Sequence, residues 1–207
     1  MFELVKAGGL LMLPIIICSI VSMAIIVERF WSLKRNKIIP PSLVRDIVGW
    51  AQKNELNSDR INAVRDESPL GRVLVSGLKN STQTRSVMKD SIEDAGRHVT
   101  HELQRFLNTL GTIAAVSPLL GLLGTVLGMI KVFSVITDIG VGSPGELAGG
   151  ISQALITTAA GIAVAIPSLM FYRYFRGKVD QLVVEMEQES IKLVEVVYGK
   201  NKNVVKE

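Results

Sequence analysis

Chemically reactive side chains are scarce in this chain of 207 residues. Its one cysteine, Cys18, excludes an intrachain disulfide, a CxxC redox pair and a cysteine-based metal site. The two histidines, His98 and His101, could share a metal, but a metal site usually takes about three or four protein ligands, so we expect solvated surface histidines and no bound metal. The sequence shows no Ser/His/Asp, Cys/His or phosphate-loop arrangement. We therefore expect neither an enzyme nor a cofactor.

Charged residues are missing from three long stretches, at residues 7–27, 106–130 and 147–172. Each stretch is long enough to cross a membrane as a helix, for which about 20 residues suffice. A mean hydropathy of +0.35 is high for a soluble chain of this length, and three membrane helices account for it. The first stretch lacks the basic segment and cleavage site of a signal peptide, so we expect an uncleaved anchor. The predicted fold class is an all-α integral membrane protein with three transmembrane helices.

Basic residues are distributed unevenly around these stretches. Of the 23 Lys and Arg residues, 14 lie between Glu28 and Arg105 and seven lie from Arg173 to the end, whereas the segment from Thr137 to Ala148 contains none. Because Lys and Arg gather on the cytoplasmic side of a membrane, we expect a periplasmic N-terminus and a cytoplasmic C-terminus. This bias also explains the net charge of +4, and without a dense basic face we expect no nucleic-acid partner.

The expected organisation has six parts. They are a periplasmic N-terminus with the first span (1–28), a cytoplasmic helical region (29–105), the second span (106–136), a short periplasmic loop (137–148), the third span (149–172) and a cytoplasmic C-terminal helix (173–207). In the first cytoplasmic part, Ser68 and Pro69 predict the N-cap and first residue of a helix. The next helix is expected to begin near Ser81 or Thr82.

Apolar residues recur at spacings of three and four before the second span and after the third. The first series is Met88, Ile92, Ala95, Val99, Leu103 and Phe106, and the second is Phe175, Val179, Leu182, Met186, Leu193 and Val197. Because the first series runs directly into a span, we expect the second and third membrane helices to continue into the cytoplasm as amphipathic rods. Such rods must pack on each other or on neighbouring subunits.

Small residues form one helical face of the second span, at Gly111, Ala114, Pro118, Gly121, Thr125 and Gly128. Gly124 and Gly128 also make a GxxxG pair, and in lipid such faces let helix backbones approach closely. We therefore predict helix packing at Gly121, Gly124, Gly128 and, on the third span, Gly161. Thr125 differs because it places a hydroxyl at mid-membrane depth.

Polar side chains also line the third span. Gln153 and Thr157 share a face, and Thr158 lies beside it. An amide or hydroxyl in hydrocarbon needs a hydrogen-bond partner, which either a tight oligomeric helix interface or a hydrated path for a cation would supply. Neither span has an acidic residue in its central region, so a conducted proton would need a carboxylate from another chain.

Four segments carry a family resemblance. They are KAGGLLMLPIIICSI at the start, ERFWSL after the first span, SPLLGLLGTVLGMI in the second and GGISQALITTAAGIAVAIP in the third. With them the chain resembles the ExbB/TolQ/MotA family of inner-membrane proton channels, and most closely its ExbB branch. The resemblance implies a multi-pass protein of the bacterial inner membrane, forming a homopentamer whose second and third spans line a central pore. It also implies an ExbD-like single-span partner with a membrane aspartate. Proton flow would then drive a TonB-like protein that energises outer-membrane uptake of siderophores, haem or vitamin B12.

The resemblance also assigns individual residues. The pore threonines of the family fall on Thr125 and Thr158, and Thr157 lies on the same polar side of the third span. Gln153, in GISQAL, stands where the family has a glutamate in GIAEAL, so a protonation role is excluded there. Hydrogen bonding, water positioning and packing stay open for this amide. The expected pore-lining set is therefore Thr125, Thr158, Gln153 and Thr157.

Two other functions stay open. A TolQ-like subunit of the Tol-Pal cell-envelope system would share these motifs. A non-conducting oligomeric membrane scaffold would use the glycine faces for packing alone.

Overall fold

The computed structural model describes residues 8–53, 58–81, 83–140 and 144–204. Regular secondary structure in these ranges is entirely helical, which confirms the predicted all-α class. In chain order the helices are α2 (Met12–Ser32), α3 (Arg35–Ile38), α4 (Leu43–Lys53), α5 (Ser58–Glu67), α6 (Pro69–Lys79), α7 (Arg85–Leu103), α8 (Leu107–Ile139) and α9 (Pro144–Val204).

The three predicted spans lie on α2, α8 and α9, where the chain is helical, long and apolar enough to cross a membrane. Pro118 lies inside α8 and Pro167 inside α9 without ending either helix. Each proline lacks an N–H and so removes one backbone hydrogen bond. Helix α9 is continuous over 61 residues, and it therefore joins the third apolar stretch to the C-terminal amphipathic segment.

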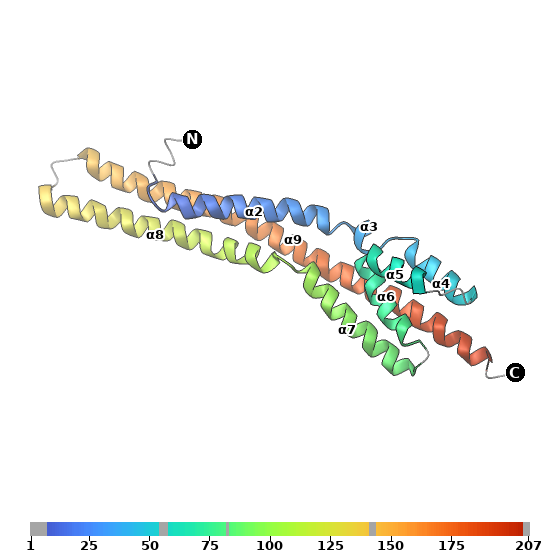
Figure 1. Ribbon diagram of the computed structural model, residues 1–207. Coiled ribbons are helices and arrows are strands. Elements are labelled where there is room, and N and C mark those ends of the chain that lie inside the picture. The colour runs from blue at the N-terminus through green and yellow to red at the C-terminus, as the bar shows by residue number, and fades with distance from the viewer. Residues whose placement is uncertain (1–7, 54–57, 82, 141–143, 205–207) are drawn as a thin grey trace. The chain divides into compact units, whose positions relative to one another are not determined.

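Contacts divide the chain into two compact units. The first unit combines Met1–Arg29 with Phe106–Tyr174. In it α8 lies antiparallel along the apolar part of α9, and α2 runs beside this hairpin (Figure 1). The candidate site lies in this unit.

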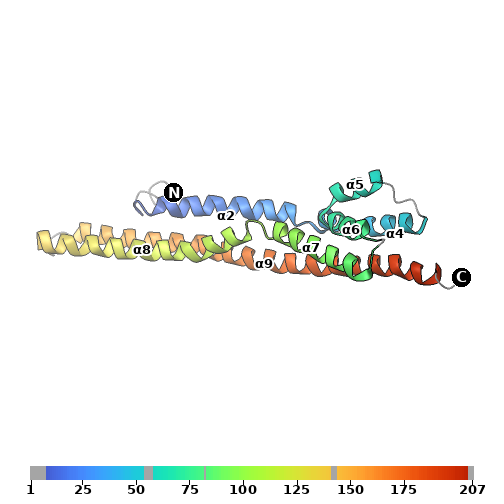
Figure 2. The same cartoon turned by 60° about the horizontal axis from the view of Figure 1, so that its bottom comes forward.

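The second unit combines Phe30–Arg105 with Phe175–Glu207. Helix α6 packs against α5 and α7, and the C-terminal part of α9 lies alongside α7 (Figure 2). The predicted apolar series on α9 supplies much of the core, because its side chains at positions 175, 179, 182, 186 and 193 are all buried. On α7, Met88, Val99 and Leu103 are buried as well.

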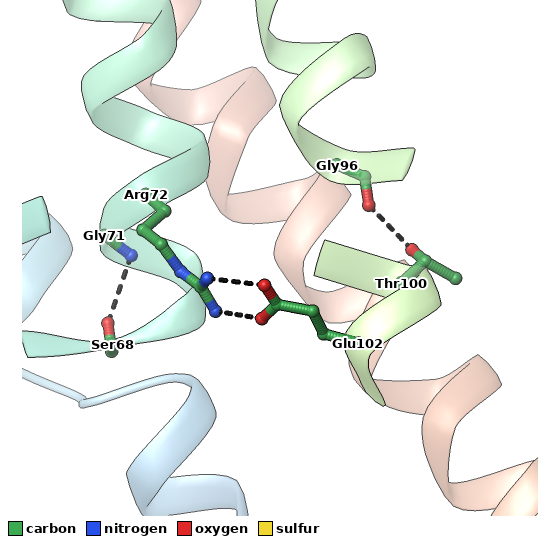
Figure 3. A network of polar contacts seen from close by, with 6 residues as sticks. All are labelled: Ser68, Gly71, Arg72, Gly96, Thr100 and Glu102. Atoms are coloured by element: carbon green, nitrogen blue, oxygen red, sulfur yellow. Dashed lines mark hydrogen bonds and ion pairs between the residues drawn. The ribbon is translucent and has the colours of Figure 1, made fainter. Parts of the chain in front are cut away.

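Polar contacts fix the start of α6 and tie it to α7 (Figure 3). As predicted, Ser68 is the N-cap and Pro69 the first helical residue, and the Ser68 hydroxyl accepts a 3.0 Å hydrogen bond from the Gly71 N–H. The Arg72 guanidinium donates two hydrogen bonds to the Glu102 carboxylate, of 2.9 and 2.5 Å. These bonds hold the pKa of Glu102 below its ordinary value.

The predicted start of the following helix was wrong. Helix α7 begins at Arg85, with Thr84 as its N-cap, and not near Ser81. A turn closed by the Gln83 N–H and the Asn80 carbonyl, 3.0 Å apart, occupies part of the expected first turn. The Thr84 hydroxyl then accepts from the Val87 N–H at 3.4 Å. Threonine at position 84 suits a cap, whereas the alternative start at Thr82 lies outside the described residues.

The expectation of one uninterrupted helix from Met88 into the second span was also wrong. Helix α7 ends at Leu103, α8 begins at Leu107, and Phe106 adopts the left-handed conformation with φ 62°. The apolar spacing continues across this turn, so periodicity could not reveal it. The Arg29 guanidinium lies 5.6 Å from the centroid of the Phe106 ring, a cation–π contact that helps hold the ring in place.

Candidate functional site

The glycines of α8 face α9 at very short range. A Cβ atom at Gly124 would lie 2.1 Å from the Thr157 hydroxyl oxygen, and one at Gly121 would lie 2.9 Å from the Thr158 Cα. At Gly128 a Cβ would lie 2.9 Å from the Gly150 carbonyl oxygen. Any larger residue at these three positions would force the two helices apart.

The facing glycine of α9 completes this contact. A Cβ at Gly161 would lie 2.4 Å from the Ser117 carbonyl oxygen and 3.2 Å from the Gly121 Cα. The structure thus places the four glycines selected for helix packing between two helices of the same chain. Close backbone approach of this kind is how small residues associate helices in lipid.

Thr158 links the two helices directly. Its hydroxyl donates a 2.9 Å hydrogen bond to the Gly121 carbonyl of α8. Gly121 allows this bond because it has no side chain between the two backbones. A threonine selected for the pore therefore makes a polar contact inside the hairpin.

Thr157 is buried in the same contact, with a 1% exposed surface. Its hydroxyl lies 3.0 Å from the carbonyl oxygens of both Gln153 and Ala154 on its own helix. Its hydrogen-bonding capacity is therefore used locally, and its side chain fills the space left by Gly124.

Thr125 occupies a more open position. It is half-buried, and its hydroxyl donates to the Leu122 carbonyl at 2.6 Å, within α8. Of the three threonines expected to line the pore, it is the one whose hydroxyl hydrogen bond lies at the exposed surface of α8, outside the α8–α9 contact. A group outside this chain could therefore reach Thr125 more readily than Thr157.

Gln153 lies against the turn that precedes α2. A Cβ at Gly9 would lie 2.1 Å from the Gln153 amide nitrogen, and Gly9 has φ +70°. A side chain at position 9 would thus be both strained and obstructed. The amide selected as pore-lining is brought instead to the N-terminal segment of the same chain. The paired glycines at 8 and 9 were the sequence signal for this close approach.

Two buried serines were not predicted from the sequence. Ser117 and Ser168 both have 0% exposed surface, and each lies next to the proline of its helix. The Ser168 hydroxyl donates to the Val164 carbonyl at 2.7 Å, whereas the Ser117 hydroxyl has no hydrogen-bond partner among the described residues. A serine adjacent to an intramembrane proline was the available signal, since both residues alter backbone hydrogen bonding.

The hairpin offers hydrogen-bonding groups and no carboxylate in its apolar part. Acidic residues are absent from 106–130 and 147–172, and among the described residues no three His, Cys, Asp or Glu side chains are grouped closely enough to hold a metal. Arg29, at the end of α2, is buried and donates to the neighbouring Glu28 carboxylate at 2.6 Å. The hydroxyls and the amide of the hairpin can orient water or a proton carrier, but these neutral groups cannot themselves take up a proton at mid-membrane depth.

The outer faces of the hairpin are strongly apolar. Side chains more than half exposed include Leu119, Leu122, Ile130 and Phe133 on α8 and Leu155, Ile166 and Met170 on α9. Apolar area of this extent needs lipid or other protein chains to cover it.

Comparison with known proteins gives consistent matches. The pattern of the MotA/TolQ/ExbB proton channel family matches residues 65–188, which include the whole α8–α9 contact described above. The putative biopolymer transport protein ExbB-like 3 of Synechocystis sp. is 32% identical over 200 residues, covering 93% of this chain and 92% of the relative. ExbB-like 1 of the same organism is 35% identical over 169 residues, covering 80% of this chain and 66% of the relative.

A more distant relative agrees with them. Biopolymer transport protein exbB1 of Vibrio cholerae is 28% identical over 191 residues, covering 89% of this chain and 83% of the relative. The family suggested by the sequence motifs is thereby confirmed. The matched pattern, the relatives and the three apolar helices together show that this chain belongs to the MotA/TolQ/ExbB proton channel family.

Proposed function

We propose that this chain is the inner-membrane proton-channel (stator) subunit of an energy-transducing complex. With an ExbD-like single-span partner, it converts the proton motive force into work on a TonB-like protein, which energises outer-membrane uptake of siderophores, haem or vitamin B12. The observation that carries the proposal is an intramembrane hairpin supplied with hydroxyls and an amide but with no acid in its apolar part.

In this proposal the partner supplies the carboxylate that the apolar part of this chain's hairpin lacks. A membrane aspartate on its helix takes up and releases the proton, and neutral groups of this chain surround that carboxylate. The transmembrane potential provides about 2.3 kcal/mol per charge per 100 mV, so a relay through one carboxylate and neutral hydroxyls is energetically workable. The exposed apolar faces of α8 and α9 support assembly with other chains, for which the proposed form is a homopentamer around a central pore.

The threonines have different parts in this mechanism. Thr125 is the more accessible hydroxyl and is proposed to contact the pore and the partner helix. Thr158, bonded to Gly121, is proposed to set the spacing of the two pore-lining helices, and Thr157 fills the contact behind it. Gln153 is proposed to hold the N-terminal segment near the outer end of the pathway.

Proton flux into vesicles tests the proposal. The chain is co-purified with its ExbD-like partner, reconstituted, and flux is followed with an enclosed pH-sensitive dye under an imposed potential. Thr125→Ala combined with Thr158→Ala should lower the flux about tenfold, the effect of losing roughly one hydrogen bond, or 1.4 kcal/mol, at the barrier.

Thr112→Ala is the matched control. Thr112 also lies on α8 and bonds a carbonyl of its own helix at 2.9 Å, but its hydroxyl is outside the α8–α9 contact. This variant should conduct like the unchanged protein. If the double variant retains full flux, the pore assignment of the two threonines is wrong.

A non-conducting scaffold is the second candidate. The four glycines and Thr157 pack within one chain, which is the observation in its favour, because that contact accounts for these residues without any pathway. In the same assay a scaffold would give no flux above that of empty vesicles. The ExbB names of the relatives support the ExbB-like role over the TolQ-like one.

A further inference from the structure

The last turn of α2 presents two aromatic rings in different environments. The Phe30 ring packs edge-on against Phe175, with centroids 5.0 Å apart, and Phe175 is only 1% exposed. The adjacent Trp31 has 69% of its surface exposed. Phe30 thus fixes the end of the helix while Trp31 projects outward.

The segment after Trp31 is held firmly by its apolar residues. Leu33 and Ile38 are 4% and 1% exposed, and Arg35 donates a 2.7 Å hydrogen bond to Glu185 on α9. These contacts leave the side chains of Lys34 and Lys37 at the surface. Burial of Leu33 and Ile38 therefore fixes the positions of the two lysines.

Lys37 sits directly over the exposed indole. Its ammonium nitrogen lies 4.7 Å from the centroid of the Trp31 ring. An ammonium group has three N–H donors, and a cation–π contact leaves donors free for an anion.

Two carboxylates are engaged by Arg29 and Arg35, which lie on either side of Trp31 in the sequence. Glu185 is bound by Arg35, and Glu28 is bound by Arg29. Neither Lys34 nor Lys37 forms an ion pair with a carboxylate within the described residues. This surface therefore carries two uncompensated positive charges beside an exposed tryptophan.

We propose that Trp31, Lys34 and Lys37 form a binding site for the phosphate headgroup of an anionic phospholipid. Trp31 lies in the last turn of an apolar helix that is long enough to cross a membrane, and tryptophan at that place favours the depth of the lipid headgroups. The two lysines bind the phosphate while the indole lies beside the glycerol and upper acyl chain. This site shares no residue with the α8–α9 contact, and lipid binding at it does not depend on proton conduction.

Quenching of tryptophan fluorescence tests the site in the full chain. The sequence has two tryptophans, so Trp50→Phe leaves Trp31 as the sole reporter. The protein is reconstituted in dioleoyl phosphatidylcholine vesicles with increasing fractions of dibrominated phosphatidylglycerol or dibrominated phosphatidylcholine. The brominated phosphatidylglycerol should quench more strongly at equal mole fraction. Its relative binding constant should fall about fivefold with each of Lys34→Gln and Lys37→Gln.

Two further variants and one competitor control the result. Lys37→Arg should retain the preference because it keeps the charge and the cation–π contact. Lys79→Gln and Lys89→Gln each remove one positive charge elsewhere on the helices of this unit, and neither should change the preference. Circular dichroism checks that every variant keeps its helix content.

Three outcomes would overturn the site. One is equal quenching by both brominated lipids, and another is the same loss of preference in the control pair, which would indicate net charge alone. The third is loss of the preference on adding inorganic phosphate at constant ionic strength, which would assign the lysines to the free ion.

Discussion

Two glycines of α8 each face a threonine of α9 across the α8–α9 contact. Gly124 leaves the space that Thr157 fills, and Gly121 leaves its carbonyl open to the Thr158 hydroxyl. The glycines therefore do more than reduce bulk, because one of them allows a hydrogen bond between the helices. At this scale the polar residues of the spans are satisfied largely inside one chain.

Replacing Gly124 by alanine should destabilise the hairpin. The new Cβ would lie 2.1 Å from the Thr157 oxygen, so the helices must separate, at a cost of about 1–3 kcal/mol as in other overpacked cores. Thermal unfolding in detergent, followed by circular dichroism, measures the change. Gly149→Ala is the matched control, since a Cβ there meets nothing within 4 Å and alanine favours the helix. Equal melting temperatures for Gly124→Ala and the unchanged protein would contradict the packing.

At the scale of secondary-structure elements, the main feature is the turn between α7 and α8. A turn at residues 104–106 separates two helices whose apolar faces are in register along the sequence. Phe106 carries the positive φ that allows the turn, and Arg29 contacts its ring. Helix α9, in contrast, passes through Pro167 without a break.

Two substitutions at Phe106 test the turn between α7 and α8. Phe106→Gly and Phe106→Ala both remove the ring, but only glycine adopts φ near +60° without strain. The glycine variant should therefore be more stable than the alanine variant by about 1 kcal/mol. In an uninterrupted helix the order is reversed, because glycine is the poorer helix former by about 1 kcal/mol. Chemical or thermal unfolding of the two purified variants decides between them.

At the scale of the whole molecule, each of the two units has its own buried residues, and the first also exposes large apolar faces. A membrane, with partner chains in it, is the environment in which those faces are stable. The family membership agrees with that setting. The proposed orientation places the segment before the third span in the periplasm and the C-terminal half of α9 in the cytoplasm.

Cysteine labelling tests that orientation. Gly145 and Gly177 both lie on α9 and are exposed, and a Cβ atom at either position would meet nothing within 4 Å. In a Cys18→Ser background, an impermeant maleimide added to spheroplasts should label Gly145→Cys at once. Gly177→Cys should react only after the membrane is permeabilised. The opposite pattern would invert the proposed topology.

Much of this protein follows from local sequence patterns. The absence of charged residues predicted the spans, and the apolar spacing predicted the buried side of the C-terminal helix. Ser68 and Pro69 predicted the start of a helix. Each of these patterns depends only on residues that are neighbours in the sequence. The family could be recognised for the same reason, since its motifs are short and continuous.

The tertiary structure decided where the polar residues of the spans point. Periodicity places Thr158 and Gln153 on helical faces, but it does not say which helix covers those faces. Only the fold brings Gly121 to Thr158 and Gly9 to Gln153, across long distances in sequence. The left-handed turn at Phe106 was hidden for a related reason. Its stabilising contact comes from Arg29, on a different helix, and spacing along the chain contains no trace of it.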